Sequence, residues 1–153
     1  MNLRVGGFIE TSASDGPGIR SVLFLQGCHH NCEGCHNKKL QNPNGGVLFN
    51  IEDILRYISN HCKNKQLTIS GGEPLEQLEA LIELTDLLVN MGFDLCVYTG
   101  NNFKDVPLRL RKNLHWLKVG DFRVGQRTLI KPFVGSSNQI MIELNKEGEA
   151  YHA

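Results

Sequence analysis

Short apolar runs alternate with amphipathic helical patterns along most of this 153-residue chain, and this alternation restricts its fold more than any other feature. Each run is typical of one buried strand, and each helical pattern predicts a helix that leads the chain back to the start of the next strand. Such strand–helix–strand units join parallel strands by right-handed crossovers, so the sequence predicts an α/β fold with a mostly parallel sheet. Strands are expected at residues 21–26, 66–70, 94–98, 115–119 and 139–144.

Three helices are expected between these strands. The first begins after Asn50, whose side chain can cap it, and its apolar residues recur at 3.6-residue spacing up to a closing Cys62. The second begins with Pro74 in its first turn, where the missing N–H costs no hydrogen bond, and ends at Gly92. A shorter third helix is expected over residues 103–112. The buried side of the second helix is expected to carry Leu78, Leu81, Leu84, Leu88 and Met91.

Three cysteines, Cys28, Cys32 and Cys35, fall within eight residues. Soft thiolates on a short loop readily bind iron as a 4Fe–4S cluster, but such a cluster has four irons and this loop offers three ligands. One iron would keep an open coordination position, where a small chelating molecule could bind and receive an electron. The other cysteines, Cys62 and Cys96, lie at a predicted helix end and in a predicted strand, where thiols usually serve as small buried hydrophobes.

A glycine-rich segment, Gly71–Pro74, directly follows the predicted strand at 66–70. Taken alone it would indicate only the start of a helix. The cysteine loop, Thr99–Gly100 and Gly120–Asp121 also follow predicted strands. Because ligands of parallel α/β sheets collect at the carboxyl ends of the strands, these four segments are expected to converge on one rim.

The cysteine spacing followed by Gly-Gly-Glu-Pro resembles the radical S-adenosylmethionine (SAM) superfamily. The segments that carry a closer resemblance extend over nearly the whole chain: Asp15–Arg20, Val22–Cys28, Cys35–Asn37, Gly71–Pro74, Val97–Gly100, Val119–Phe122 and Gly135–Gln139. They are most similar to activating proteins of anaerobic (class III) ribonucleoside-triphosphate reductases. Two positions differ: Gly34 replaces an aromatic residue common in the superfamily, and His36 replaces a Tyr usual in the subfamily.

This resemblance implies one radical SAM domain over residues 1–153, folded as a small open partial (β/α) barrel. It also implies an enzyme that reductively cleaves SAM and uses the 5′-deoxyadenosyl radical to generate a glycyl radical on anaerobic ribonucleoside-triphosphate reductase. The implied cofactors are SAM and a 4Fe–4S cluster, the latter held by Cys28, Cys32 and Cys35.

The resemblance further implies two groups of SAM-binding residues. Two adjacent glycines are expected to let the backbone approach the methionine part closely, with the carboxylate that follows them near its ammonium group. The residues on either side of the third cysteine are expected to meet the adenine. The residues concerned are Gly34, Cys35, His36, Gly71, Gly72 and Glu73.

A half-barrel leaves one side of its site uncovered, and the resemblance implies that a glycine loop of the partner reductase completes it. Asp15–Arg20 and Gly135–Gln139 are candidate docking segments, although a tight turn and a polar loop describe them equally well. An external one-electron donor is required, and a flavodoxin-like protein is expected. Residues 104–131 carry eight Lys or Arg against two Asp, which fits an acidic donor or an ordinary solvated surface equally.

Three alternatives stay open on the sequence alone. A structural zinc site would combine the three cysteines with one of His29, His30 and His36. An iron–sulfur redox sensor or electron carrier would normally need a fourth cysteine near the loop. Among enzymes, an activator of pyruvate formate-lyase or of a related glycyl-radical enzyme fits Asp15–Gly18 and Leu25–Cys28, although those activators are considerably longer.

Sixteen basic and sixteen acidic residues give zero formal net charge, which provides no overall attraction to nucleic acid or to an anionic membrane. The sequence shows no apolar stretch long enough for a signal peptide or a membrane span, and its five cysteines are an odd number. Reduced thiols and a cytoplasmic location are therefore expected. Trp116 is expected in the core, and His61, His115 and His152 are expected to be ordinary surface or packing residues.

Overall fold

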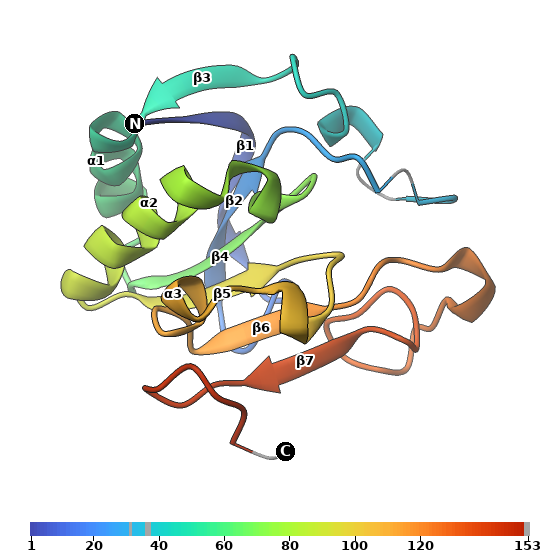
Figure 1. The fold of residues 1–153 in the computed structure, drawn as a ribbon. Helices are drawn as coiled ribbons and strands as arrows, with labels where there is room; N and C mark the ends of the chain where they lie inside the picture. Colours follow the sequence, from blue (N-terminus) through green and yellow to red (C-terminus); the bar gives the residue numbers. More distant parts are fainter. Residues whose placement is uncertain (31, 36–37, 152–153) are drawn as a thin grey trace.

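A single seven-stranded sheet forms the centre of the computed structural model, which describes residues 1–30, 32–35 and 38–151 (Figure 1). The strands follow the order β3-β1-β2-β4-β5-β6-β7, so β3 and β7 form opposite edges and the sheet is open. Their bounds are β1 Asn2–Ser12, β2 Arg20–Leu25, β3 Val47–Asn50, β4 Gln66–Gly71, β5 Asp94–Tyr98, β6 Trp116–Val119 and β7 Ile140–Glu143.

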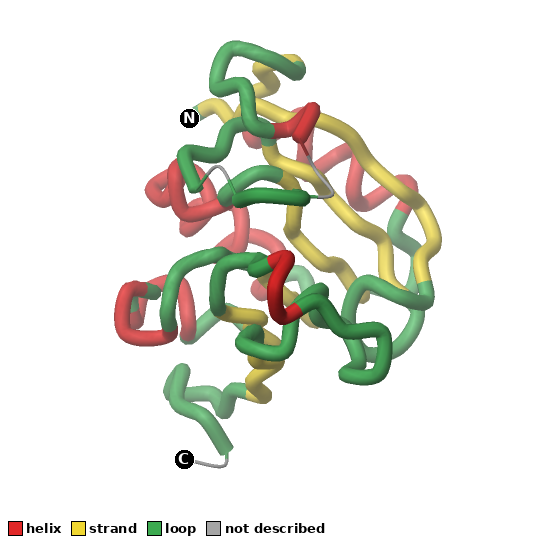
Figure 2. Tube along the Cα trace, turned by 90° about the vertical axis from the view of Figure 1, so that its right-hand side faces the viewer, coloured by secondary structure: helices red, strands yellow, loops and turns green. Residues whose placement is uncertain are grey.

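The central strands β2, β4, β5 and β6 are parallel, as the strand–helix alternation predicts. At the edges, β1 is antiparallel to both β2 and β3, and β7 is antiparallel to β6. The predicted α/β class is confirmed, and the sheet is a parallel centre with antiparallel additions on both sides. In Figure 2 the right-hand side of Figure 1 faces the viewer, and this is the side on which the loops after β2 and β6 lie.

Strands β1 and β3 were not predicted, and their side-chain patterns explain why. β1 contains the pair Gly6–Gly7 and mixes exposed with partly buried residues, so it shows no clean alternation. Every residue of β3 is exposed. Both strands are therefore defined by pairing with distant segments, which local sequence does not reveal.

The helices begin largely where the capping signals indicate. They are α1 Ile51–His61, α2 Leu78–Asn90 and α3 Leu108–Arg111, with short 3₁₀ turns η1 Lys38–Leu40, η2 Pro74–Gln77, η3 Phe103–Asp105 and η4 Val124–Gln126. The Asn50 side chain caps α1 by accepting a hydrogen bond from the Asp53 N–H at 2.8 Å. Cys62 is the residue at the other end of α1.

Two helix predictions need correction. The segment from Pro74 to Gly92 is a 3₁₀ turn followed by an α-helix, and Met91 lies past the helix end, 39% exposed instead of buried. The helix expected over residues 103–112 is interrupted, because Pro107 lacks an N–H and disfavours helical geometry in the residue before it. Val106 accordingly has φ −90° and ψ 116°, which is extended backbone.

The core lies between the sheet and the helices. Cys62 and Cys96 belong to the buried residues, which confirms the hydrophobic role predicted for both thiols. Trp116 is only partly buried and packs against the His115 ring with 4.7 Å between centroids, so its core assignment was wrong. Among the described residues, no helix is both long and apolar enough to span a bilayer. Buried core residues include Leu23, Ile54, Ile58, Leu67, Ile69, Leu81, Leu84, Leu88, Leu95, Val97 and Leu117.

His115 has a more specific role than the surface or packing position expected of it. Its Nδ1 contacts the Asp94 carboxylate, and its Nε2 lies 2.8 Å from Glu143 Oε2, so the ring joins β5 to β7. Partial burial acts to lower the pKa of His115, but the hydrogen bonds to Glu143 and Asp94 outweigh it, and the pKa is raised. Both carboxylates are paired best when the imidazole carries its proton.

This pairing predicts a pH-dependent contribution of His115 to stability. A raised folded-state pKa stabilises the fold fully below the unfolded value near 6.5, and the benefit disappears as pH rises through the folded value. His115→Gln should therefore cost up to about 1 kcal/mol at pH 6, because the pair is partly exposed, and less at pH 9. Urea titrations of both proteins at the two pH values measure this, and an equal cost at both would rule out the charged pairing.

Candidate functional site

A cavity of about 610 Å³ opens at the carboxyl ends of the parallel strands. Its walls include Cys28 after β2, Gly71 at the end of β4, Thr99 after β5 and Gly120 after β6. The four segments predicted to converge on one rim therefore do so.

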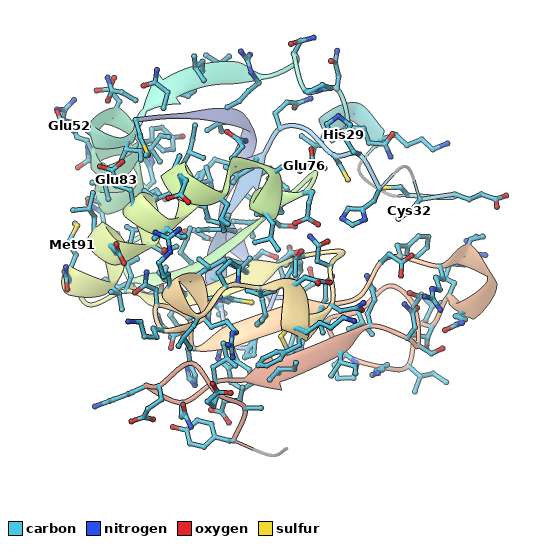
Figure 3. The ribbon with its side chains drawn as sticks, viewed as in Figure 1. His29, Cys32, Glu52, Glu76, Glu83 and Met91 are labelled. Atoms are coloured by element: carbon cyan, nitrogen blue, oxygen red, sulfur yellow. The ribbon has the colours of Figure 1, made fainter. Side chains whose placement is uncertain are left out.

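All three loop cysteines, Cys28, Cys32 and Cys35, line this cavity. The base of their loop is held by backbone hydrogen bonds from Gly27 N to Leu40 O at 2.6 Å and from Cys28 N to Gln41 O at 3.0 Å. The labelled Cys32 and His29 lie on this loop, beyond the end of the sheet (Figure 3). Burial raises the pKa of the Cys32 thiol.

The donor set fits an iron–sulfur cluster better than a single zinc ion. His29 Nδ1 lies 2.6 Å from Glu76 Oε1, and His30 Nε2 lies 2.9 Å from Glu73 Oε1, so both rings contact carboxylates instead of joining the thiols. Figure 3 shows the labelled His29 and Glu76 close together. Three soft thiolates on one cavity wall remain, which is the donor chemistry of iron–sulfur clusters.

Gly71 and Gly72 are required first for the packing of the backbone. A Cβ on Gly71 would overlap the backbone of Leu25, and a Cβ on Gly72 would lie 2.6 Å from Leu40 O and closer still to Gly27 O. These glycines let β4 pass directly against the end of β2 and the base of the cysteine loop. The sequence interpretation, which assigned the missing Cβ atoms to contact with a ligand, did not foresee this requirement.

Glu73 is a buried carboxylate, 1% exposed, that links three parts of the site. Its Oε1 accepts a hydrogen bond from Gly100 N at 2.7 Å and pairs with His30 at 2.9 Å. Its Oε2 accepts from the Thr99 hydroxyl at 2.7 Å and from Leu75 N at 3.0 Å. The bond to Glu73 raises the pKa of His30. Glu73 thus fixes the cysteine loop and the turn after β5 relative to each other.

Lys118 and Tyr98 also line the cavity, and neither was predicted as a site residue. Lys118 Nζ lies 3.8 Å from the centre of the Tyr98 ring, and burial lowers the pKa of Lys118 to about 8. The Tyr98 hydroxyl is buried without a hydrogen-bond partner in the described part of the chain. The available signal was a lysine inside the apolar run Trp116–Val119, since a charge in a central strand points to a special environment.

Of the two residues that flank Cys35, the structure describes one, Gly34. Gly34 packs beneath the loop after β6, where a Cβ would lie 3.1 Å from Val124 Cγ2 and 3.6 Å from Phe122 Cε2. This contact joins the cysteine loop to the opposite wall of the cavity. His36, the other predicted adenine contact, lies outside the described residues.

The two candidate docking segments use much of their polar chemistry inside the fold. Arg20 is 2% exposed and donates to Thr68, to backbone carbonyls and to Asp94, 2.8 Å away. Gln139 is 6% exposed, and its amide accepts from Gly135 N at 2.7 Å and donates to Gly120 O at 3.0 Å. These contacts favour the alternative interpretation, a turn and a loop that shape the cavity.

Comparison with known proteins agrees with this site. A family model described as "4Fe-4S single cluster domain" matches residues 14–142. The chain is 36% identical over 114 residues to the anaerobic ribonucleoside-triphosphate reductase-activating protein of Enterobacteria phage T4, covering 70% of this chain and 69% of that one. It is 32% identical over 147 residues to the protein of the same name from Haemophilus influenzae, covering 88% and 94%.

Longer relatives match over part of their length. The pyruvate formate-lyase-activating enzyme of Clostridium pasteurianum is 35% identical over 101 residues, which are 60% of this chain and 42% of that enzyme. Among solved structures, QueE from Escherichia coli has a similar fold, with a TM-score of 0.55 and 22% identity over 65% of this chain. The present chain spans about half of QueE, 53% of its length.

The open α/β sheet, the three-cysteine cavity and the family match together define a 4Fe–4S protein with a radical SAM fold. The chain belongs to the family of anaerobic ribonucleoside-triphosphate reductase-activating proteins. The resemblance inferred from the motifs is therefore confirmed, and so is the expectation of an iron–sulfur cluster.

Proposed function

We propose that this chain is an activating enzyme that reductively cleaves SAM and generates a glycyl radical on anaerobic ribonucleoside-triphosphate reductase. The observation that carries the proposal is the meeting of Cys28, Cys32 and Cys35 with Gly71–Glu73 in one cavity. The match to the Haemophilus influenzae activator over 94% of its length supports the same partner. The pyruvate formate-lyase activators support the same chemistry but are matched over less than half their length.

The three cysteines would hold the cluster. When bound, a 4Fe–4S cluster with three protein ligands supplies an electron to the sulfonium of SAM and an iron position to which SAM can coordinate. The cavity residues bind and orient SAM around it. Gly34 keeps the cysteine loop against the wall formed by Phe122 and Val124. We keep His36 as a proposed adenine contact.

Glu73 is proposed to accept a hydrogen bond from the amino group of SAM. Its four present partners are two backbone N–H groups, the Thr99 hydroxyl and the ring of His30, whose side chain is 25% exposed. His30 is therefore the partner that a ligand can replace without breaking the fold. Gly71 and Gly72 keep the backbone beside this carboxylate in place.

Lys118 is proposed to pair with the carboxylate of SAM. Its side chain is partly buried in the cavity wall, and no carboxylate in the described part of the chain forms an ion pair with it. A partly buried cation is stabilised by an anion that enters the same site. The Tyr98 hydroxyl supplies a second polar group in the cavity.

Replacing Lys118 with Met should weaken SAM binding about tenfold, because a hydrogen-bonded charge pair is lost. Since the pKa of Lys118 is lowered to about 8, wild-type affinity should fall as pH rises above 8, and the Met variant should lack this decline. Equilibrium dialysis of reconstituted protein with labelled SAM measures both effects. Lys112→Met, at an exposed position, is the control. If Lys118→Met and wild type bound SAM with equal affinity, Lys118 would not pair with the SAM carboxylate.

The proposed function is tested with anoxically reconstituted protein, SAM and dithionite. We expect release of 5′-deoxyadenosine and, with the reductase added, a glycine-centred doublet in the electron paramagnetic resonance (EPR) spectrum. Tightly held zinc with no SAM cleavage would contradict the proposal. A doublet on a pyruvate formate-lyase, and none on the reductase, would show that the partner of this chain is pyruvate formate-lyase.

We propose a flavodoxin-like electron donor, a cytoplasmic location and a single radical SAM domain over residues 1–153 as parts of the same account. The basic stretch at 104–131 offers less surface charge than its composition indicates, because Lys118 is partly buried and Arg111 is engaged with Gly148 O and Glu149. Arg123, Arg127 and Lys131 are exposed. Donor binding that did not weaken with added salt would argue against this surface.

A further inference from the structure

The loop between β6 and β7 carries an unusual apolar tip. Leu129 is 99% exposed and Ile130 is 94% exposed, more than any other large apolar side chain among the described residues. Met1, at the chain terminus, follows at 67%. Single exposed apolar residues are common on proteins, but two adjacent ones almost fully in water call for an explanation. We name Leu129 and Ile130 the rim tip.

The rim tip is held in place by the loop around it. Thr128 N donates to Gly135 O at 3.1 Å, and the Lys131 ammonium donates to Gln139 O at 2.7 Å. Gln139 is itself buried and bonded to the end of β6. The tip therefore projects from an internally bonded loop, which appears in Figure 1 as the orange segment beside β7.

The position of the rim tip restricts what can cover it. Leu129 itself lines the cavity, and so do Thr128, Lys131 and Phe133 next to the tip. A molecule that enters the cavity from this side therefore meets the tip. The proposed reaction requires such a molecule, namely the segment of a partner enzyme that carries the glycine to be activated.

Charge around the tip indicates the chemistry of the partner. Arg123 and Arg127 are exposed on the same loop, together with the Lys131 side chain. The nearest acidic residue along this loop, Asp121, contacts Arg123 at 3.2 Å. The complementary surface is an apolar socket bordered by acidic side chains.

We propose that the rim tip is the docking element for the glycyl-radical reductase, inserting Leu129 and Ile130 into an apolar, acid-bordered socket beside its glycine loop. This proposal rests on the proposed function and adds the surface by which the partner is recognised. Docking there places reductase atoms across the mouth of the cavity and excludes water from it.

The test is the affinity of the reconstituted enzyme for the reductase, measured by biolayer interferometry under anoxic conditions. The double variant Leu129→Asp with Ile130→Asp should bind about 30-fold more weakly or worse, because it would place two carboxylates in an apolar socket bordered by acidic side chains. A matched control, Leu48→Asp with Leu108→Asp, changes two exposed apolar residues on β3 and α3 and should bind within about twofold of wild type. The milder pair Leu129→Ala with Ile130→Ala should show an intermediate loss.

Two further readouts separate this inference from the proposed function. If wild-type enzyme produces the glycine-centred doublet while the Asp and Ala variants bind like wild type, the function stands and the docking inference is overturned. If wild-type enzyme neither binds nor activates the reductase, both are overturned. A variant that alters only the sedimentation of the chain alone would mark the tip as a contact between two copies and would also overturn the proposal.

Discussion

Replacing any one of Cys28, Cys32 or Cys35 with Ala should abolish both cluster assembly and SAM cleavage. A cubane held by three protein ligands has no ligand to spare, and the three thiols line a single cavity wall. Wild-type protein reconstituted anoxically should contain about four irons per chain, and each variant should contain close to none. Iron and sulfide analysis, together with the yield of 5′-deoxyadenosine, measures the effect.

Cys62 and Cys96 provide matched controls within the same chain. Both thiols are buried, at 2% and 0% exposure, and neither lines the cavity. Cys62→Ala and Cys96→Ala should retain the cluster and lose at most about 1–2 kcal/mol of stability from the cavities they leave. If Cys62→Ala folded normally but lost its iron, the assignment of the three ligands would be wrong.

Gly72→Ala should be among the most destabilising single-methyl additions in the protein. Its Cβ would collide with two backbone carbonyls, those of Gly27 and Leu40, and backbone has no rotamer with which to yield. The cysteine loop would have to move away from β4, at an expected cost of about 3 kcal/mol. Chemical denaturation of the apo-protein gives the loss of stability, and iron content gives the accompanying loss of cluster binding.

Gly125→Ala is the corresponding control for Gly72→Ala. A Cβ at Gly125 meets nothing within 4 Å, so this variant should stay within about 0.5 kcal/mol of wild type. Equal stability of Gly72→Ala and Gly125→Ala would show that the backbone contacts around Gly72 do not constrain the site.

The parallel centre of the sheet was predictable because each of its strands is a short, largely apolar run followed by a glycine or a polar turn. The same rule placed the cysteine loop, Gly71 and Thr99 on one rim, where the structure has them. The edges were not predictable. β1 lacks a regular apolar pattern, and β3 exposes every residue, so only pairing with other strands defines them.

The chemistry of the cavity was predictable in part. The three cysteines were found because their close spacing along the sequence indicates metal binding. Glu73 was found, but its bonds to His30, Thr99 and Gly100 depend on how the cysteine loop and the turn after β5 lie around it. Lys118 is partly buried because β6 lies between β5 and β7, an arrangement that its own sequence does not encode.

The central claim is that three cysteines hold a 4Fe–4S cluster and leave one iron free to bind SAM. EPR of the anoxically reduced protein, recorded before and after SAM is added, tests it most directly. The account predicts a reduced-cluster signal whose g-values change when SAM is added and stay unchanged with a SAM analogue that lacks the amino and carboxylate groups. A signal that SAM leaves unaltered, or a protein that takes up no iron, would contradict it.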